Sequence, residues 1–238
     1  MNEADLFGQA LMDHYQGKRY KLELERDDGY MDEQIMDFYF RNFERFPEPE
    51  KKALKHAKGR VLDIGVGAGR AALWLQEKGH EVVGIDISGY ALEVCRLRGV
   101  KKLVKMSACD LKFRKNTFDT AIALFNNFGL CGNMDSVALM LSRLHRIIKD
   151  DGLFLAESIH PTETKKRAHT RYHKINIARG RPPGQATLRV HYRSHVGDWW
   201  DLLMVTPDEM RQLCERTGWR IWRTYRGAPM YVYVLKKV

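Results

Sequence analysis

The stretch RVLDIGVGAGR, residues 60–70, constrains the fold of this chain more than any other segment. A short apolar run leads into the alternating glycines Gly65, Gly67 and Gly69, and a helix-like segment follows. Glycine allows a sharp left-handed turn and lets a ligand lie against bare backbone, where a Cβ atom would collide. The pattern therefore predicts a strand, a ligand-binding turn and a helix in direct succession.

Two acidic residues stand where a nucleoside ligand would need them. Asp86 ends the second apolar run, EVVGID, where a strand end offers a carboxylate to two ribose hydroxyls. Asp63 stands two residues before the first glycine, and the glycine spacing is G-x-G-x-G rather than the G-x-G-x-x-G of dinucleotide sites. A carboxylate there would repel a pyrophosphate but attract an ammonium or sulfonium group. The alternative, a glycine-rich turn in an unrelated α/β domain, does not explain the two acids.

These residues resemble motif I of the class I S-adenosylmethionine-dependent methyltransferases. The resemblance covers about residues 60–158 and implies S-adenosylmethionine as the cofactor. It also implies an α/β fold with a doubly wound, Rossmann-like seven-stranded sheet and a C-terminal antiparallel strand. The alternation of strand-like and helix-like segments from residue 60 onward predicts the same parallel architecture.

The 238 residues fit one such domain with additions. We expect an N-terminal helical lid segment over residues 1–58 and the methyltransferase domain over residues 59–238. The domain carries a basic insert after its fifth strand, at about residues 160–198, in which ATLRVHYR reads as a strand.

The N-terminal segment is expected to fold over the cofactor. Helices are predicted over residues 6–15 and 31–43, with a charged loop between them and with Pro47 and Pro49 ending the second helix. Members of the resembled family often use tyrosine or arginine from such a lid to meet the cofactor. The candidates here are Tyr15, Tyr20, Arg26 and Tyr30.

The resemblance assigns cofactor contacts beyond the glycine turn. The run KLVKMSACD is predicted to be the third strand, which Asp110 ends. In this family the acid at that position accepts from the adenine amino group, and the next backbone amide, here that of Leu111, meets a ring nitrogen. The segment LFNNFG resembles the L-G-N-S-F of enzymes similar to glycine N-methyltransferase, in which the leucine backbone meets the cofactor; Phe125 replaces the glycine. The predicted cofactor site is Asp63, Gly65, Gly67, Asp86, Ile87, Asp110, Leu111 and Leu124.

Two residues are predicted on the acceptor side. By the same resemblance Asn126 faces the methyl acceptor, although asparagines are also common in turns. His160, just past the fifth strand, is the first choice for a general base, because the free imidazole pKa lies near working pH; the alternative is a structural histidine. His191 and His195 are four apart, but on a strand and without a nearby carboxylate, so no metal site is predicted.

Four scattered cysteines, with no C-x-x-C pair, predict reduced thiols rather than a zinc site or a disulfide framework. The sequence shows neither a signal peptide nor an 18-residue apolar run, so we expect a cytoplasmic protein without a membrane partner.

The net charge of +10 is concentrated in one window. Residues 164–197 contain no Asp or Glu and hold Lys165, Lys166, Arg167, Arg171, Lys174, Arg179, Arg181, Arg189 and Arg193. Such asymmetry indicates an anionic partner, or else a solvated basic surface.

Three functions remain open from the sequence. The first is a methyltransferase that acts on a small, anionic metabolite held by arginines within residues 171–193. The second is an RNA methyltransferase that uses the basic segment 164–197 to bind the backbone. The third is a cofactor-binding regulator without activity. The acceptor atom (N, O or C) and the oligomeric state are not predicted.

Overall fold

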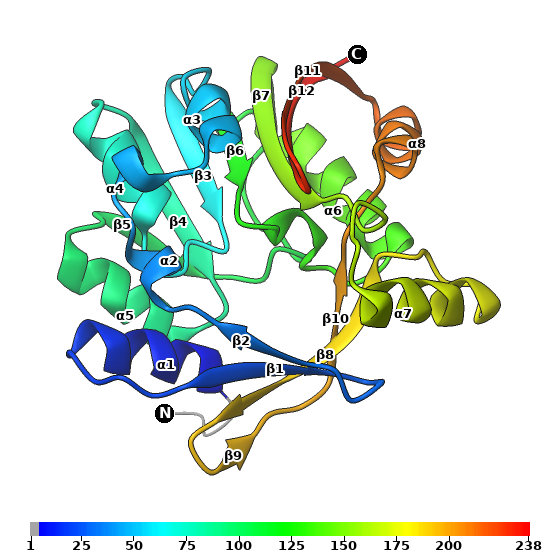
Figure 1. The fold of residues 1–238 in the computed structure, drawn as a ribbon. Helices are drawn as coiled ribbons and strands as arrows, with labels where there is room; N and C mark the ends of the chain where they lie inside the picture. The colour runs from blue at the N-terminus through cyan, green and yellow to red at the C-terminus, as the bar shows by residue number, and fades with distance from the viewer. Residues whose placement is uncertain (1–4) are drawn as a thin grey trace.

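The computed structural model describes residues 5–238, which form two β-sheets with flanking helices (Figure 1). The larger sheet has seven strands in the order β11-β12-β7-β6-β3-β4-β5. Its strands are β3 (Arg60–Ile64), β4 (Glu81–Asp86), β5 (Lys102–Lys105), β6 (Phe118–Ala123), β7 (Ile148–Ile159), β11 (Trp219–Gly227) and β12 (Met230–Lys237). Neighbouring strands from β5 to β7 pair in parallel, and β12 is antiparallel to both of its neighbours. The predicted fold class is confirmed.

Helices cover both faces of this sheet through separate apolar clusters. One face packs against α3 (Glu48–Leu54), α4 (Arg70–Glu77) and α5 (Gly89–Arg98), and the other against α6 (Met134–Ile147) and α8 (Pro207–Thr217). Local signals set the helix ends. Ser88 accepts from the Ala91 N–H as the N-cap of α5, and Gly99 ends that helix in the left-handed conformation.

A second sheet joins the N-terminal segment to the insert. Its strand order is β10-β8-β1-β2, with β9 paired to β8, and all of these pairs are antiparallel. The strands are β1 (Leu22–Arg26), β2 (Met31–Gln34), β8 (Gln185–Tyr192), β9 (His195–Val196) and β10 (Trp200–Leu203). Figure 1 shows this sheet across one end of the molecule, with α1 (Leu6–Tyr15) and α7 (Arg167–Ala178) at its two sides. The strand predicted in the insert is confirmed.

The secondary structure predicted for residues 21–43 is wrong. The expected charged loop is the hairpin β1–β2, because LELER alternates apolar and charged residues at the period of a strand and finds a partner in β8. Only the short helix α2 (Asp37–Phe40) and the 3₁₀ turn η1 (Phe43–Arg45) remain of the expected second helix. Pro47 and Pro49 begin α3 rather than end a helix. Proline fits there because backbone N–H groups in the first helical turn have no partner within the helix, so the missing N–H costs nothing.

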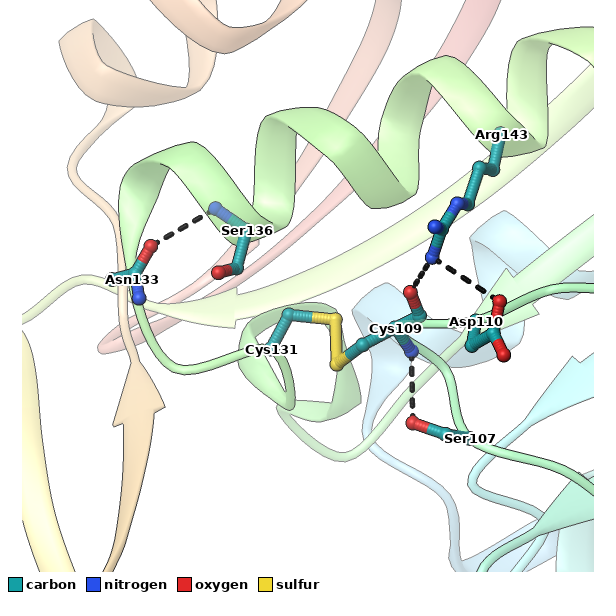
Figure 2. Close-up of a disulfide and its surroundings, with 7 residues drawn as sticks. All are labelled: Ser107, Cys109, Asp110, Cys131, Asn133, Ser136 and Arg143. Carbon is teal, nitrogen blue, oxygen red and sulfur yellow. Dashed lines mark hydrogen bonds and ion pairs between the residues drawn. A yellow bond between two sulfur atoms is a disulfide. The ribbon is translucent and has the colours of Figure 1, made fainter.

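The prediction of reduced thiols is wrong for one cysteine pair. Cys109 and Cys131 form a disulfide, with their Cα atoms 5.5 Å apart and a separation of 22 positions in sequence (Figure 2). The bond joins the loops that follow β5 and β6, which meet at the carboxyl edge of the sheet. Cys95 and Cys214 are buried free thiols.

None of the helices between residues 5 and 238 combines the length and the apolar composition needed to traverse a bilayer.

Candidate active site

The glycine-rich turn follows β3, and each glycine has its own reason to lack a side chain. Gly65, Gly67 and Gly69 all have positive φ, at 69°, 55° and 80°. A Cβ on Gly65 would lie 2.5 Å from Asn127 Nδ2, and one on Gly69 would lie 2.8 Å from a Val100 methyl. A Cβ on Gly67 would meet nothing closer than 3.9 Å. Gly65 and Gly69 therefore permit close packing, whereas Gly67 leaves open backbone beside which a ligand fits.

Asp86 ends β4 beside this turn, as predicted. Its Oδ2 accepts from the Gly67 N–H at 3.0 Å, and its Oδ1 accepts from the Ser88 N–H at 2.9 Å. Burial raises the pKa of this carboxyl above its usual range. The next side chain, Ile87, is 69% exposed, so an apolar surface borders the acid.

Asp63 lies on β3 directly below the turn and is 5% exposed. Burial raises the pKa of its carboxyl to about 7, against the opposing charge of Arg70, and the nearby Asp86 adds to the rise. A cationic ligand above the turn would favour the ionised form of Asp63.

A buried charge cluster next to Asp63 was not predicted from the sequence. Arg70, the first residue of α4, donates to both carboxylate oxygens of Glu50, at 2.6 Å and 2.9 Å. Glu50 is fully buried and Glu157 is 2% exposed. Burial, and then the neighbouring charge of Glu50, raises the pKa of Glu157 well above its usual range. The available signal was a glutamate inside the otherwise apolar strand GLFLAES.

The turn after β6 has an unusual backbone. Phe125 and Asn126 are consecutive non-glycine residues with positive φ, at 58° and 65°. Such residues cost about 1–3 kcal/mol each and persist where the surroundings hold them. Asn126 Oδ1 accepts from the Ile159 N–H at 3.1 Å, and Asn127 Nδ2 donates to the carbonyls of Ile64 and Gly65 at 3.1 Å and 2.7 Å. Asn127 therefore reaches the glycine turn, while Asn126 ties its loop to the end of β7.

The predicted adenine-side residues lie on the loop that β5 leads into. β5 ends at Lys105, five residues before Asp110, so Asp110 does not end the strand. The chain turns at Ser107, whose hydroxyl accepts from the Cys109 N–H and whose carbonyl accepts from the Asp110 N–H. Asp110 is exposed and pairs with Arg143 at 3.6 Å (Figure 2). It also pairs with Lys112 at 2.8 Å, and the hydrogen bond from Lys112 holds the pKa of Asp110 below its usual range. Leu111 and Leu124 are buried.

His160 follows β7 at the same edge of the sheet. Its backbone N–H donates to the Pro229 carbonyl at 2.7 Å. In its side chain, ring Nδ1 lies 3.2 Å from the Thr162 hydroxyl, and the ring centroid lies 5.5 Å from that of Tyr231. Because Ile159 binds Asn126, the two predicted acceptor-side residues are neighbours in the structure.

One residue of the N-terminal segment that was not predicted lies close to the glycine-rich turn. Tyr39 of α2 packs edge-on against Phe125, with ring centroids 4.8 Å apart, and its hydroxyl donates to Gln34 at 3.4 Å. Its ring is also the side chain nearest to the position that a Cβ on Gly67 would occupy, at 3.9 Å. Of the predicted lid residues, Tyr15 and Tyr20 are exposed, while Arg26 is buried in an ion pair with Asp28. The aromatic run DFYF was the signal for this contact.

The arginines of the insert are largely engaged with carboxylates. They clasp the N-terminal segment and a neighbouring strand through the pairs Arg179–Asp27 (3.1 Å), Arg181–Asp201 (2.9 Å), Arg189–Glu25 (2.7 Å) and Arg193–Asp13. Strand alternation also places Arg189 and Glu25 on the sheet face opposite Leu24 and Val190, which pack toward α1.

Within the described part of the chain, His, Cys, Asp and Glu side chains nowhere gather in threes that could hold a metal ion.

The chain is similar to known methyltransferases. A family model described as "Methyltransferase domain" matches residues 62–156. Among solved structures, the chain is similar to a SAM-dependent methyltransferase from Bacteroides fragilis in complex with S-adenosyl-L-homocysteine. The TM-score is 0.84 and the identity 28%, over 99% of this chain and 96% of that chain.

Curated relatives are more distant or partial. A phosphatidylethanolamine N-methyltransferase from Cereibacter sphaeroides is 38% identical over 99 residues, which are 38% of this chain and 48% of that protein. A glycine/sarcosine N-methyltransferase from Aphanothece halophytica is 22% identical over 94% of this chain and 92% of that protein. The chain spans about half the length of several curated relatives that it matches.

Proposed function

Because the chain belongs to the class I S-adenosylmethionine-dependent methyltransferase family, we propose that it transfers the methyl group of S-adenosylmethionine to a small-molecule acceptor. One observation carries the proposal: the open backbone of Gly67 lies beside the carboxyl of Asp86, and β3, which leads into the same turn, carries the buried carboxyl of Asp63. These carboxyls would repel a diphosphate and attract the ammonium and sulfonium groups of this cofactor.

We assign the predicted residues to the parts of the cofactor. Asp86 would bind the ribose hydroxyls, and Asp63 would face the ammonium group. Asp110 and the Leu111 amide would meet adenine, which requires the Asp110 carboxylate to turn from Lys112. The full set is Asp63, Gly65, Gly67, Asp86, Ile87, Asp110, Leu111 and Leu124.

The protein's main contribution to the reaction is alignment. The cofactor, when bound, would supply an electrophilic methyl group, whose transfer forms a bond to the acceptor's nucleophilic atom as the bond to sulfur breaks. The turn carrying Asn126 would hold the acceptor in line with that carbon. His160 would take the proton that an N–H or O–H acceptor releases. Tyr39 and the N-terminal segment would exclude water from above Gly67.

The paired arginines bear on the choice of acceptor. Arg179, Arg181, Arg189 and Arg193 already bind carboxylates, so they support neither an anionic metabolite nor an RNA backbone. We therefore propose a small-molecule acceptor, and these arginines give no indication of its charge.

Methyl-labelled S-adenosylmethionine incubated with size-fractionated cell extract tests the proposal. Label is expected in the small-molecule fraction, with much less transfer by an Asp86→Ala variant. Label in nuclease-sensitive polymer would establish the RNA alternative instead. Tight cofactor binding without transfer to any fraction would establish a non-catalytic regulator and contradict the proposed activity.

A further inference from the structure

The strained turn after β6 is held in place by one buried carboxyl group. Phe125 is the first of its two left-handed residues, and its N–H donates to Glu157 Oε2 at 2.8 Å. Two residues further along β7, the Ile159 N–H binds the Asn126 side chain. The end of β7 thus holds both left-handed residues, one through its own side chain and one through its backbone.

The same turn is bound to the glycine-rich turn. Asn127 Nδ2 donates to the Gly65 carbonyl at 2.7 Å, and the Arg70 guanidinium lies 5.0 Å from the centroid of the Phe125 ring. The same ring packs edge-on with Tyr39 of the N-terminal segment. A movement of Phe125 would therefore be transmitted both to the cofactor turn and to the lid.

Glu157 is itself held from two further elements. Its carboxyl lies beside that of Glu50 from α3, and Glu50 is fixed by two hydrogen bonds from Arg70 of α4. Both glutamates are buried, so two adjacent carboxylates would repel each other strongly if both were charged. A neutral Glu157 resolves this conflict, because it can donate its proton to Glu50 while its other oxygen accepts from Phe125.

We infer that Glu157 is a positioning residue for methyl transfer: its neutral carboxyl fixes the Phe125–Asn126 turn, and thereby the acceptor, against the glycine-rich turn. The inference rests on the proposed function. The charged groups that face Glu157 are Glu50 and Arg70, and Arg70 also interacts with Asp63. On the neighbouring strand β12, Val232 lies opposite Glu157 in register. Ionisation of Glu157 adds a charge beside Glu50, so alkaline pH should release the turn.

The test compares Glu157→Gln and Glu157→Ala with Ser158→Ala as the matched control. Ser158 is a buried neighbour on β7 whose hydroxyl accepts from the Val205 N–H, so this control loses a buried hydrogen bond without touching the turn. Two quantities are measured across pH: hydrogen exchange of the amides of residues 124–128, and turnover at saturating cofactor.

Glu157→Ala should speed exchange in the turn and lower kcat by about tenfold or more, with KM for the cofactor changed by less than about threefold. Glu157→Gln, a neutral isostere, should keep the turn protected and abolish the alkaline loss of turnover that the unmodified protein shows. Ser158→Ala should leave turn exchange and the pH profile unchanged.

Unchanged turn exchange in Glu157→Ala, or an alkaline loss that persists in Glu157→Gln, would overturn the inference, and the second result applies even if Glu157→Ala fails to fold. Failure of the proposed function has a different signature: the unmodified protein methylates no acceptor, while the exchange measurements still report whether Glu157 holds the turn.

Discussion

The carboxyl edge of the large sheet and the second sheet are held together by different forces. At the carboxyl edge, acidic groups such as Asp63 and Glu157 are buried, and burial raises their pKa values. In the second sheet, the Glu25–Arg189 pair keeps 19% and 32% of its side-chain surface exposed, and the hydrogen bond from Arg189 lowers the pKa of Glu25. The first region is a preorganised site with buried charges. The second is a clasp of partly exposed ion pairs, which salt can weaken.

The two regions should respond to pH in opposite directions. A group with a lowered folded pKa, such as Glu25, stabilises the fold above its unfolded pKa, and that stabilisation is lost as the pH falls through the folded pKa. A carboxyl with a raised folded pKa, such as Glu157, favours the fold at low pH and disfavours it as the pH rises through the raised value. Acid should therefore loosen the second sheet first, and alkali should loosen the carboxyl edge first.

The largest expected effect comes from adding one methyl group to the glycine turn. Gly65→Ala places a Cβ 2.5 Å from Asn127 Nδ2 at a φ of 69°, so the turn must move. We expect calorimetry to show cofactor affinity reduced by about a hundredfold or more. Gly79→Ala is the matched control, because Gly79 also has a positive φ of 87° but has open space around it. Normal affinity in Gly65→Ala would mean that the ligand does not bind at this turn.

Removal of the carboxylate proposed to bind the ribose should have the next largest effect. Asp86→Ala deletes the carboxylate beside Gly67 and should weaken cofactor binding by about tenfold, through loss of charge-assisted hydrogen bonds. Asp119→Ala serves as the control: this carboxylate binds the Arg60 N–H at 2.8 Å, where β3 begins, at the opposite edge of the sheet. Equal loss of affinity in both variants would show a general effect of destabilisation.

The buried acid below the turn should make cofactor binding depend on pH. Because the pKa of Asp63 is raised to about 7, the carboxylate that favours a cation is mostly absent at pH 6 and mostly present at pH 8. Affinity should rise by about tenfold between these values in the unmodified protein. Asp63→Asn should flatten that rise. A steep rise that survives in Asp63→Asn would assign the titration to another group.

The smallest effect should come from the clasp of the second sheet. Glu25→Gln should speed hydrogen exchange in β1 and β8 by about threefold at low salt, with a smaller difference at high salt, and should leave cofactor affinity unchanged. Glu93→Gln, which removes an exposed pair with Arg96 on α5, controls for general loss of charge. A large, salt-independent loss of cofactor affinity in Glu25→Gln would contradict the view of this pair as a peripheral clasp.

The glycine turn and the acid that follows it were predictable because their signals are local. Gly65, Gly67 and Asp86 lie within one strand–turn–helix–strand unit, in which short-range geometry fixes every position. The roles of Asn126 and Asn127 were not predictable in the same way. Adjacent asparagines look alike in sequence, and which of them reaches Gly65 depends on the left-handed backbone of Phe125 and Asn126.

The second sheet shows what a single-sequence pattern cannot supply. The acid-free insert was interpreted as a surface for an external anion or as a solvated basic surface. In the structure, two of its arginines, Arg179 and Arg189, bind Asp27 and Glu25 of the β1–β2 hairpin, 152 and 164 residues earlier in the chain. The Cys109–Cys131 disulfide was hidden for the same reason, since it joins loops that only the sheet order brings together. Long-range complementarity between an acid-rich and an acid-free segment was the unused signal.

A crystal structure of the protein grown with S-adenosylhomocysteine tests the central claim most directly. The account predicts the nucleoside lying across the backbone of Gly67, with its ribose on Asp86 and its amino-acid end toward Asp63. A ligand seated away from this turn, or a diphosphate bound in its place, would contradict it.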